Sequence, residues 1–127
     1  MALEFDNEVQ EKVHGNITKW GRELYGETLN TMTNGDFSIS FGSAIIYITL
    51  RPAGDDECFV NFWAPLIDEI EISSELMEYL LHENYALPPF GGFGIGTRKD
   101  GQEFISIEET IIGSSTTKDE LRLTVGW

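Results

Sequence analysis

The glycine-rich run Gly91–Gly96 has the spacing most suggestive of ligand chemistry. A glycine loop can cradle a phosphate when it follows a strand and opens a helix, so that backbone amides point at the anion. This run instead follows a predicted helix and Pro88-Pro89, it leads into a predicted strand, and Thr97 stands where the third glycine of the fingerprint would fall. We therefore predict a strand whose glycines leave room for Trp63 or another aromatic residue from across the sheet, or for a partner's backbone.

Other candidate nucleophiles and ligands are isolated in the sequence. His14 and His82 lie far apart, and neither belongs to a metal-ligand motif such as HExxH, so we expect surface or partly packed histidines. No Gly-x-Ser-x-Gly segment exposes a serine nucleophile, and Ser114-Ser115 is interpreted as a loop and helix cap. The single cysteine, Cys58, has apolar neighbours and is predicted to be a small buried hydrophobic residue. We predict no catalytic residue, no metal site and no cofactor.

Acidic residues are adjacent at several places, a pattern that raises the question of carboxylate catalysis. The clusters are Asp55-Asp56-Glu57, Asp68-Glu69, Glu108-Glu109 and Asp119-Glu120. None has the alternating oxygens, the glycine and the distal glutamate of a calcium loop. A catalytic carboxylate pair depends on separation in space, so a small hydrolase or lyase built on Asp55, Asp56 and Asp68 is the alternative enzyme hypothesis. Solvated acidic surface explains the clusters without further assumption, and we prefer it.

The charge balance narrows the class of partner. Eight Lys and Arg stand against 22 Asp and Glu, which gives a net charge of −14. Nucleic acids and anionic membranes are bound through clustered cations, whereas here only Arg98 and Lys99 are adjacent. We therefore predict no nucleic-acid partner and no membrane partner. A partner attracted by long-range electrostatics should be basic or carry a basic segment.

Apolar periodicity predicts a helix followed by three strands. A helix is expected over residues 7–25, where apolar residues recur at spacings of three and four: Val9, Val13, Ile17, Trp20 and Leu24. Strands are expected over 37–41, where apolar and small polar residues alternate, over 44–50, and over 57–65. Gly42-Ser43 permits a tight turn, and the short connections indicate an antiparallel meander.

The second half predicts a helix, a hairpin and a closing helix. Ser73 or Ser74 caps a helix that ends near Asn84, and Pro88-Pro89 blocks its continuation. A strand is expected over 90–98, and Asp100-Gly101 is the strongest hairpin signal in the chain, followed by a strand over 103–107. Thr116 or Thr117 opens a third helix over 118–125. The prediction is an α+β fold in one domain, residues 1–127, ordered as helix, three-stranded antiparallel meander, helix, β-hairpin, helix.

The start of the chain has no basic region and no apolar stretch, and the longest apolar run, 44–50, is too short to span a membrane. With one cysteine and no export signal, a reducing cytoplasm is the expected location.

Four segments stand out in the order of elements given above: Ala64-Pro65-Leu66, Leu80-Leu81-His82-Glu83-Asn84, Gly92-Phe93-Gly94-Ile95 and Asp100-Gly101. Together with that order, they resemble the YbjN family, which shares its fold with type III secretion chaperones. The resemblance covers essentially the whole chain, although the closing helix is shorter than is usual in the family. It implies a small acidic protein that dimerises and binds other proteins, with no catalytic residues to carry over.

Composition and resemblance together predict a non-enzymatic, chaperone-like or regulatory module that acts as a homodimer and holds a partner polypeptide in extended form. The predicted partner or dimer surface comprises Leu76, Met77, Leu80, Leu81, Trp63 and Phe93. A small-molecule sensor is a further alternative, and it predicts an enclosed apolar cavity lined by Phe59, Trp63 and Phe93.

Overall fold

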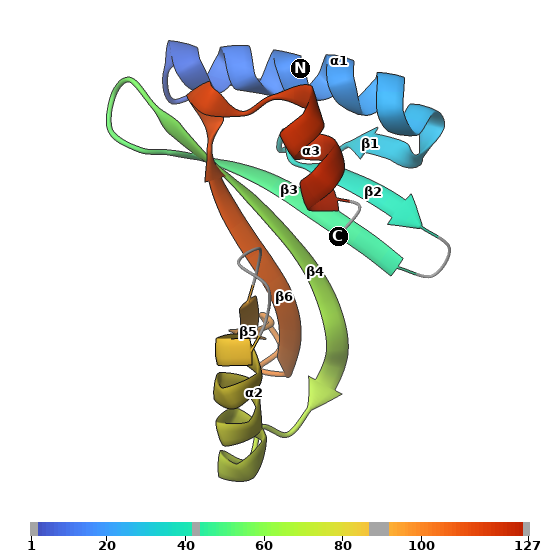
Figure 1. Ribbon diagram of the computed structural model, residues 1–127, viewed down its shortest axis with the longest axis vertical. Coiled ribbons are helices and arrows are strands. Elements are labelled where there is room, and N and C mark those ends of the chain that lie inside the picture. The colour runs from blue at the N-terminus through green and yellow to red at the C-terminus, as the bar shows by residue number, and fades with distance from the viewer. Residues whose placement is uncertain (1–2, 42–43, 87–91, 126–127) are drawn as a thin grey trace. The chain divides into compact units, whose positions relative to one another are not determined.

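The computed structural model describes residues 3–41, 44–86 and 92–125, and its architecture is α+β (Figure 1). In these residues, three α-helices accompany a six-stranded sheet with the strand order β1-β2-β3-β4-β6-β5. The predicted fold class is confirmed. Within the described residues, no helix is long and apolar enough to cross a membrane.

Helix α1 (Glu8–Tyr25) forms where the apolar spacing predicted it. The Asn7 side-chain oxygen accepts a hydrogen bond from the Gln10 backbone N–H at 2.8 Å, which caps the helix. Glu8 and Glu11 lie in the first turn, where the helix dipole favours negative charge. The helix ends at Gly26, whose backbone N–H bonds to the Arg22 carbonyl. The buried side of α1 carries Val13 and Ile17 into the core.

The first strands differ from the predicted meander in number and length. Between α1 and the predicted strands lie a 3₁₀ turn (Gly26–Thr28) and a short strand, β1 (Leu29–Thr31). Three residues are too few to show alternation, so the sequence does not predict β1. Strand β2 (Phe37–Phe41) is as predicted, and β3 (Ala44–Pro52) is slightly longer. The predicted turn at residues 42–43 lies outside the described residues.

Strand β4 (Cys58–Ile70) corrects the expected strand end at Pro65. A proline removes one backbone donor, which interrupts a single position of a ladder without forbidding an extended chain. The strand therefore continues through Pro65. The antiparallel pairings β1–β2 and β2–β3 hold Leu29 opposite Ile39 and Phe37 opposite Ile48.

Helix α2 (Ser74–Ala86) runs two residues past the predicted end at Asn84. Strand β5 (Gly92–Thr97) and strand β6 (Glu103–Ile112) form the predicted hairpin, although β6 is longer than expected. The predicted start of β5 at residue 90 lies outside the described residues. A second 3₁₀ turn (Gly113–Ser115) precedes α3 (Lys118–Val125), which Thr117 caps by accepting a hydrogen bond from the Glu120 N–H.

The chain divides into two compact units. We call residues 1–62 and 110–127 the α1 unit, and residues 63–109 the α2 unit. In the α1 unit, α1 and α3 pack on one face of the strands (Figure 1), and the core between them is closed by buried side chains of both helices and of β2, β3 and β4. These are Val13, Ile17, Phe37, Ile39, Ile48, Cys58, Val60, Phe62, Leu121 and Val125. In the α2 unit, the buried hydrophobic residues among the described side chains are Leu80 and Ile105.

Candidate binding surface

Helix α2 presents an apolar row to solvent. Ser73 Oγ accepts a hydrogen bond from the Leu76 N–H at 3.1 Å and fixes the start of the helix. Leu80 is 8% exposed and packs into the unit, with Leu76 half-buried one turn before it. Met77 and Leu81, also one turn apart, are 42% and 70% exposed. The helix therefore packs Leu80 and part of Leu76 into its own unit, and it leaves Met77 and Leu81 available for contact with another molecule.

In the hairpin of β5 and β6, a glycine of β5 leaves space for an aromatic ring of β6. Its turn is closed by hydrogen bonds from Gly101 N–H to the Arg98 carbonyl and from Arg98 N–H to the Gln102 carbonyl. Gly96 pairs with Phe104, and a Cβ at Gly96 would come within 2.3 Å of the Phe104 ring. The Phe104 and Trp63 rings lie 6.2 Å apart. The interpretation of the glycines as space for an aromatic residue is confirmed at Gly96, where Phe104 is that residue, whereas a Cβ at Gly94 would meet Glu108 and one at Gly92 would meet Asn84.

The side chain of Asn84 joins α2 to the backbone of β5. Its side-chain Nδ2 donates to the Phe93 carbonyl at 3.2 Å, and its Oδ1 accepts from the Phe93 N–H. One amide therefore makes the two hydrogen bonds that a neighbouring strand would make to Phe93. The sequence placed Asn84 only near the helix end, because a contact to the next element leaves no periodic signal.

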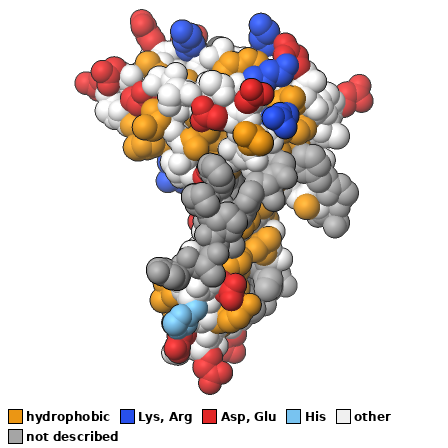
Figure 2. Space-filling view, in the orientation of Figure 1, with side chains coloured by type: hydrophobic (Ala, Val, Ile, Leu, Met, Phe, Trp, Pro, Cys, Tyr) orange, Lys and Arg blue, Asp and Glu red, His pale blue; other side chains and the backbone are white. Residues whose placement is uncertain are grey.

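The α2 unit is strongly acidic. It holds ten Asp and Glu against Arg98 and Lys99, a net charge of −8. Around α2, Figure 2 shows acidic side chains beside hydrophobic ones. Arg98 forms an ion pair with Asp100 at 2.7 Å. Burial raises the pKa of Glu109 above its ordinary value.

All six residues predicted for a partner or dimer surface lie in the α2 unit. Leu80 is buried, Met77 and Leu81 are exposed, and Leu76, Trp63 and Phe93 are half-buried. Phe59, predicted with Trp63 and Phe93 to line a sensor cavity, belongs to the α1 unit and is exposed.

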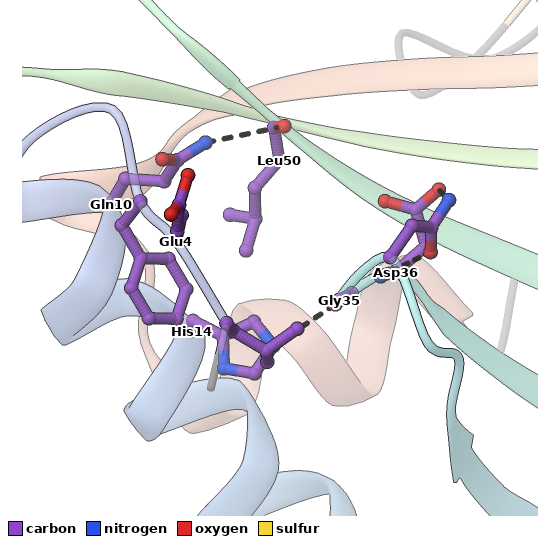
Figure 3. Close-up of a pocket in the computed structure, with 9 residues that line it drawn as sticks. Glu4, Gln10, His14, Gly35, Asp36 and Leu50 are labelled. Carbon is purple, nitrogen blue, oxygen red and sulfur yellow. Dashed lines mark hydrogen bonds between the residues drawn. The ribbon is translucent and has the colours of Figure 1, made fainter. Parts of the chain in front are cut away.

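One cavity of about 40 Å³ lies in the α1 unit (Figure 3). His14 lines it, and its ring lies 5.1 Å from that of Phe5 and 4.6 Å from that of Phe37. His14 Nε2 is 2.9 Å from the Gly35 carbonyl, which can only accept, so Nε2 carries a proton. The space suits about one or two water molecules rather than a cofactor. His14 is therefore a packed histidine, and His82 is an exposed one.

The remaining candidates have structural contacts. Cys58 is fully buried, and desolvation, with a further contribution from Glu57, raises the pKa of its thiol, as expected for a buried hydrophobic residue. Hydrogen bonds from the Ser114 hydroxyl and from the Cys58 and Ser114 N–H groups lower the pKa of Glu57. Asp55 and Asp56 are exposed in the loop between β3 and β4. Across the described ranges, no group of three or more His, Cys, Asp or Glu is placed to hold a metal ion.

The described part of the chain thus combines an α+β fold with exposed apolar residues on an acidic helix. The model of one protein family, described as T3SS (YopN, CesT) and YbjN peptide-binding chaperone 1, matches residues 7–90. The match covers more than half of the chain, from the cap of α1 through α2, so the chain belongs to this family, and the predicted resemblance is confirmed. Comparison with curated proteins and with solved structures gave no match.

Proposed function

We propose that this chain is a non-enzymatic, chaperone-like protein that binds an extended segment of a partner polypeptide. The observation that carries the proposal is the row of exposed apolar residues on α2, Met77 and Leu81, within a unit of net charge −8. The family description supports the same class of ligand. Catalysis has no part in this proposal.

The ligand is a segment that combines apolar and basic residues. Apolar side chains of the segment cover Met77 and Leu81, and its cations lie near Glu75, Glu78 and Glu83 of α2, a helix whose described residues include no lysine or arginine. Long-range attraction between opposite charges speeds encounter, and burial of apolar area holds the complex. Added salt therefore weakens binding.

The protein acts as a homodimer in this proposal. The α2 unit buries few of its described side chains and exposes Met77, Tyr79, Leu81 and Ile95, and a second copy would cover part of that area. Trp63, Phe93 and Leu76 are half-buried and supply additional apolar contact, whereas Leu80 is buried.

We place the protein in the cytoplasm, where a lone buried thiol such as Cys58 stays reduced. The two units are one domain in this proposal, because β4 and β6 each run from one unit into the other.

Two synthetic peptides test the binding proposal. One consists of repeats of Leu-Ser-Lys-Ser, and in its twin glutamate replaces each lysine. Fluorescence anisotropy should show binding of the basic peptide, weakened by salt, and little binding of the acidic twin.

A matched pair of variants locates the site. Met77→Ser with Leu81→Ser should weaken binding of the basic peptide about tenfold or more, because two exposed apolar contacts are lost. Ile112→Ser with Leu123→Ser removes equally exposed side chains from the α1 unit and should leave binding unchanged. Equal losses in both variants, or no binding to the unmodified chain, would contradict the proposal.

A further inference from the structure

Strand β6 carries a charged residue at a position where its burial pattern calls for an apolar one. From Ile107 to Ile112, half-buried and exposed residues alternate without interruption. Ile107 and Ile111 are half-buried, and Glu109 occupies the half-buried position between them. Inward-pointing charges can protect the edge strand of a sheet, but β6 lies between β4 and β5. Protection of an edge therefore does not explain Glu109.

The register of the hairpin shows which side chains share the face of Glu109. Phe93 pairs with Ile107, two residues before Glu109. Ile95 pairs with Ile105, the next position on that face. Paired residues, and residues two apart in one strand, point to the same side of a sheet. We call this set the hairpin face, and its members are Phe93, Ile95, Ile105, Ile107 and Glu109.

The hairpin face is covered only in part. Ile105 is 2% exposed, whereas its partner Ile95 is 42% exposed. Phe93 and Ile107 are half-buried, as is Glu109. Apolar area thus remains accessible on the same face as a carboxylate that is itself partly desolvated.

Among the described residues, no group neutralises the Glu109 carboxylate. All eight Lys and Arg lie in this part of the chain, and none of them forms an ion pair or a hydrogen bond with Glu109. The two cations of the α2 unit, Arg98 and Lys99, belong to the hairpin turn, and β6 rises roughly 20 Å from Glu103 to Glu109. Burial raises the pKa of Glu109, which shows that the carboxylate is partly desolvated. A half-buried charge without a partner destabilises the free chain.

The cation that fits such a carboxylate is a guanidinium. An arginine side chain is more weakly hydrated than a lysine ammonium, and it forms two parallel N–H···O bonds with one carboxylate. Its methylene groups can cover apolar side chains such as Ile107, and its planar group can stack on an aromatic ring such as Phe93. The hairpin face offers all three kinds of contact.

We propose that Glu109 binds an arginine of the partner segment, and that the protein therefore prefers arginine to lysine at one position of its ligand. The inference rests on the binding function proposed above and names the residue that selects among basic segments. The exposed Glu75 and Glu78 of α2 attract any cation, because solvated ion pairs depend little on geometry. Glu109 discriminates because its pairing takes place in a partly desolvated, apolar environment.

Removal of the charge should stabilise the free chain, which is the opposite of what a structurally required carboxylate would show. At neutral pH, Glu109→Gln should raise the midpoint of urea denaturation, because the half-buried charge is gone. Glu108→Gln is the matched control, since Glu108 is exposed and lies on the opposite face of β6. It should leave the midpoint unchanged. A lower midpoint in Glu109→Gln would overturn the proposal.

Two basic peptides measure the preference directly. One consists of repeats of Leu-Ser-Arg-Ser and the other of repeats of Leu-Ser-Lys-Ser. Fluorescence anisotropy with the full chain should show roughly five- to tenfold tighter binding of the arginine peptide, for one additional charge-assisted hydrogen bond. Glu109→Gln should bind the two peptides equally, whereas Glu108→Gln should keep the preference of the unmodified chain.

The outcomes separate this inference from the binding function. If the unmodified chain binds both peptides equally, or if Glu109→Gln keeps the preference for arginine, the role of Glu109 is overturned and the binding function stands. If the unmodified chain binds neither peptide, both are overturned. Weaker self-association of Glu109→Gln in sedimentation velocity, with its arginine preference intact, would assign Glu109 to a contact with a second copy and would also overturn the proposal.

Discussion

The α1 unit and the α2 unit bury their apolar residues to very different extents. In the α1 unit, ten hydrophobic side chains form a closed core under α1 and α3. In the α2 unit, Leu80 and Ile105 are the buried hydrophobic residues among those described, and the net charge is −8 against −6 in the larger α1 unit. Since burial of apolar area stabilises a fold, the α1 unit should be the stable part of the chain. The α2 unit is free to use its apolar residues for contact.

Truncation of a buried side chain should show the difference in stability between the two units most clearly. Ile17→Ala in the α1 unit should lower the free energy of unfolding by about 2–5 kcal/mol, because it leaves a cavity in a closed core. Ile105→Ala in the α2 unit should mainly lower the free energy of local opening over residues 63–109. Amide exchange measures both effects. If Ile105→Ala accelerates the slowest α1 amides as much as Ile17→Ala does, the units do not differ in stability.

Loss of the Asn84 side chain should loosen the α2 unit next. Asn84→Ala leaves the N–H and carbonyl of Phe93 without their partner, a loss of roughly 1–3 kcal/mol. The Phe93 amide should then exchange at least tenfold faster. Asn61→Ala is the matched control, since the Asn61 amide bonds only to the exposed Thr110 hydroxyl at 2.9 Å, and we expect a change of about 0.5 kcal/mol or less. An unchanged rate at Phe93 in Asn84→Ala would refute the proposed role of Asn84.

Substitution of alanine for two glycines, one in each unit, should change stability in opposite directions. Gly96→Ala drives a methyl group into the Phe104 ring and should destabilise the α2 unit by about 1–3 kcal/mol. Gly15→Ala places a methyl group on exposed α1 with no neighbouring atom within 4 Å, and it should stabilise the α1 unit by about 1 kcal/mol through helix propensity. Thermal unfolding of both variants checks the signs. A stabilising Gly96→Ala would mean that Phe104 does not need the space.

The smallest expected effect concerns pH and the α1 unit. Hydrogen bonds, first from the Ser114 hydroxyl, lower the pKa of Glu57 in the folded state. Glu57 therefore contributes stability that is present above its unfolded pKa and is lost as the pH falls through the lowered folded pKa. Chemical denaturation from pH 6 down to pH 3 should show a shallower loss of stability in Glu57→Gln than in the unmodified chain. Asp56→Asn, an exposed neighbour, should keep the slope of the unmodified chain, and a slope common to all three proteins would count against the Glu57 contacts.

The sequence predicts the elements well where their periodicity is long. The apolar row from Val9 to Leu24 predicts α1, alternation predicts β2, and a run of apolar residues predicts β3. The sequence does not predict β1 because three residues carry no period, and it predicts the end of β4 too early because a proline often marks a strand boundary. Whether a strand can contain a proline depends on whether the neighbouring strand needs a hydrogen bond at that position, and the residues around the proline do not show this.

The candidate surface was predictable only in part. Leu76 to Leu81 stand out as apolar residues on a short helix, but the sequence does not show which of them are inside, and the structure buries Leu80 and exposes Leu81. The bond between Asn84 and Phe93 depends on how α2 returns to β5, and no spacing rule contains that information. Phe104 pairs with Gly96 by the register of the hairpin, which the Asp100-Gly101 turn specifies once it is known to form.

Amide exchange by mass spectrometry, with and without the basic Leu-Ser-Lys-Ser peptide, tests the central claim most directly. If the α2 unit is the binding surface, the peptide should slow exchange over α2 and β5 and leave α1 and α3 unchanged. Slower exchange confined to α1 and α3, with α2 unaffected by bound peptide, would contradict the account.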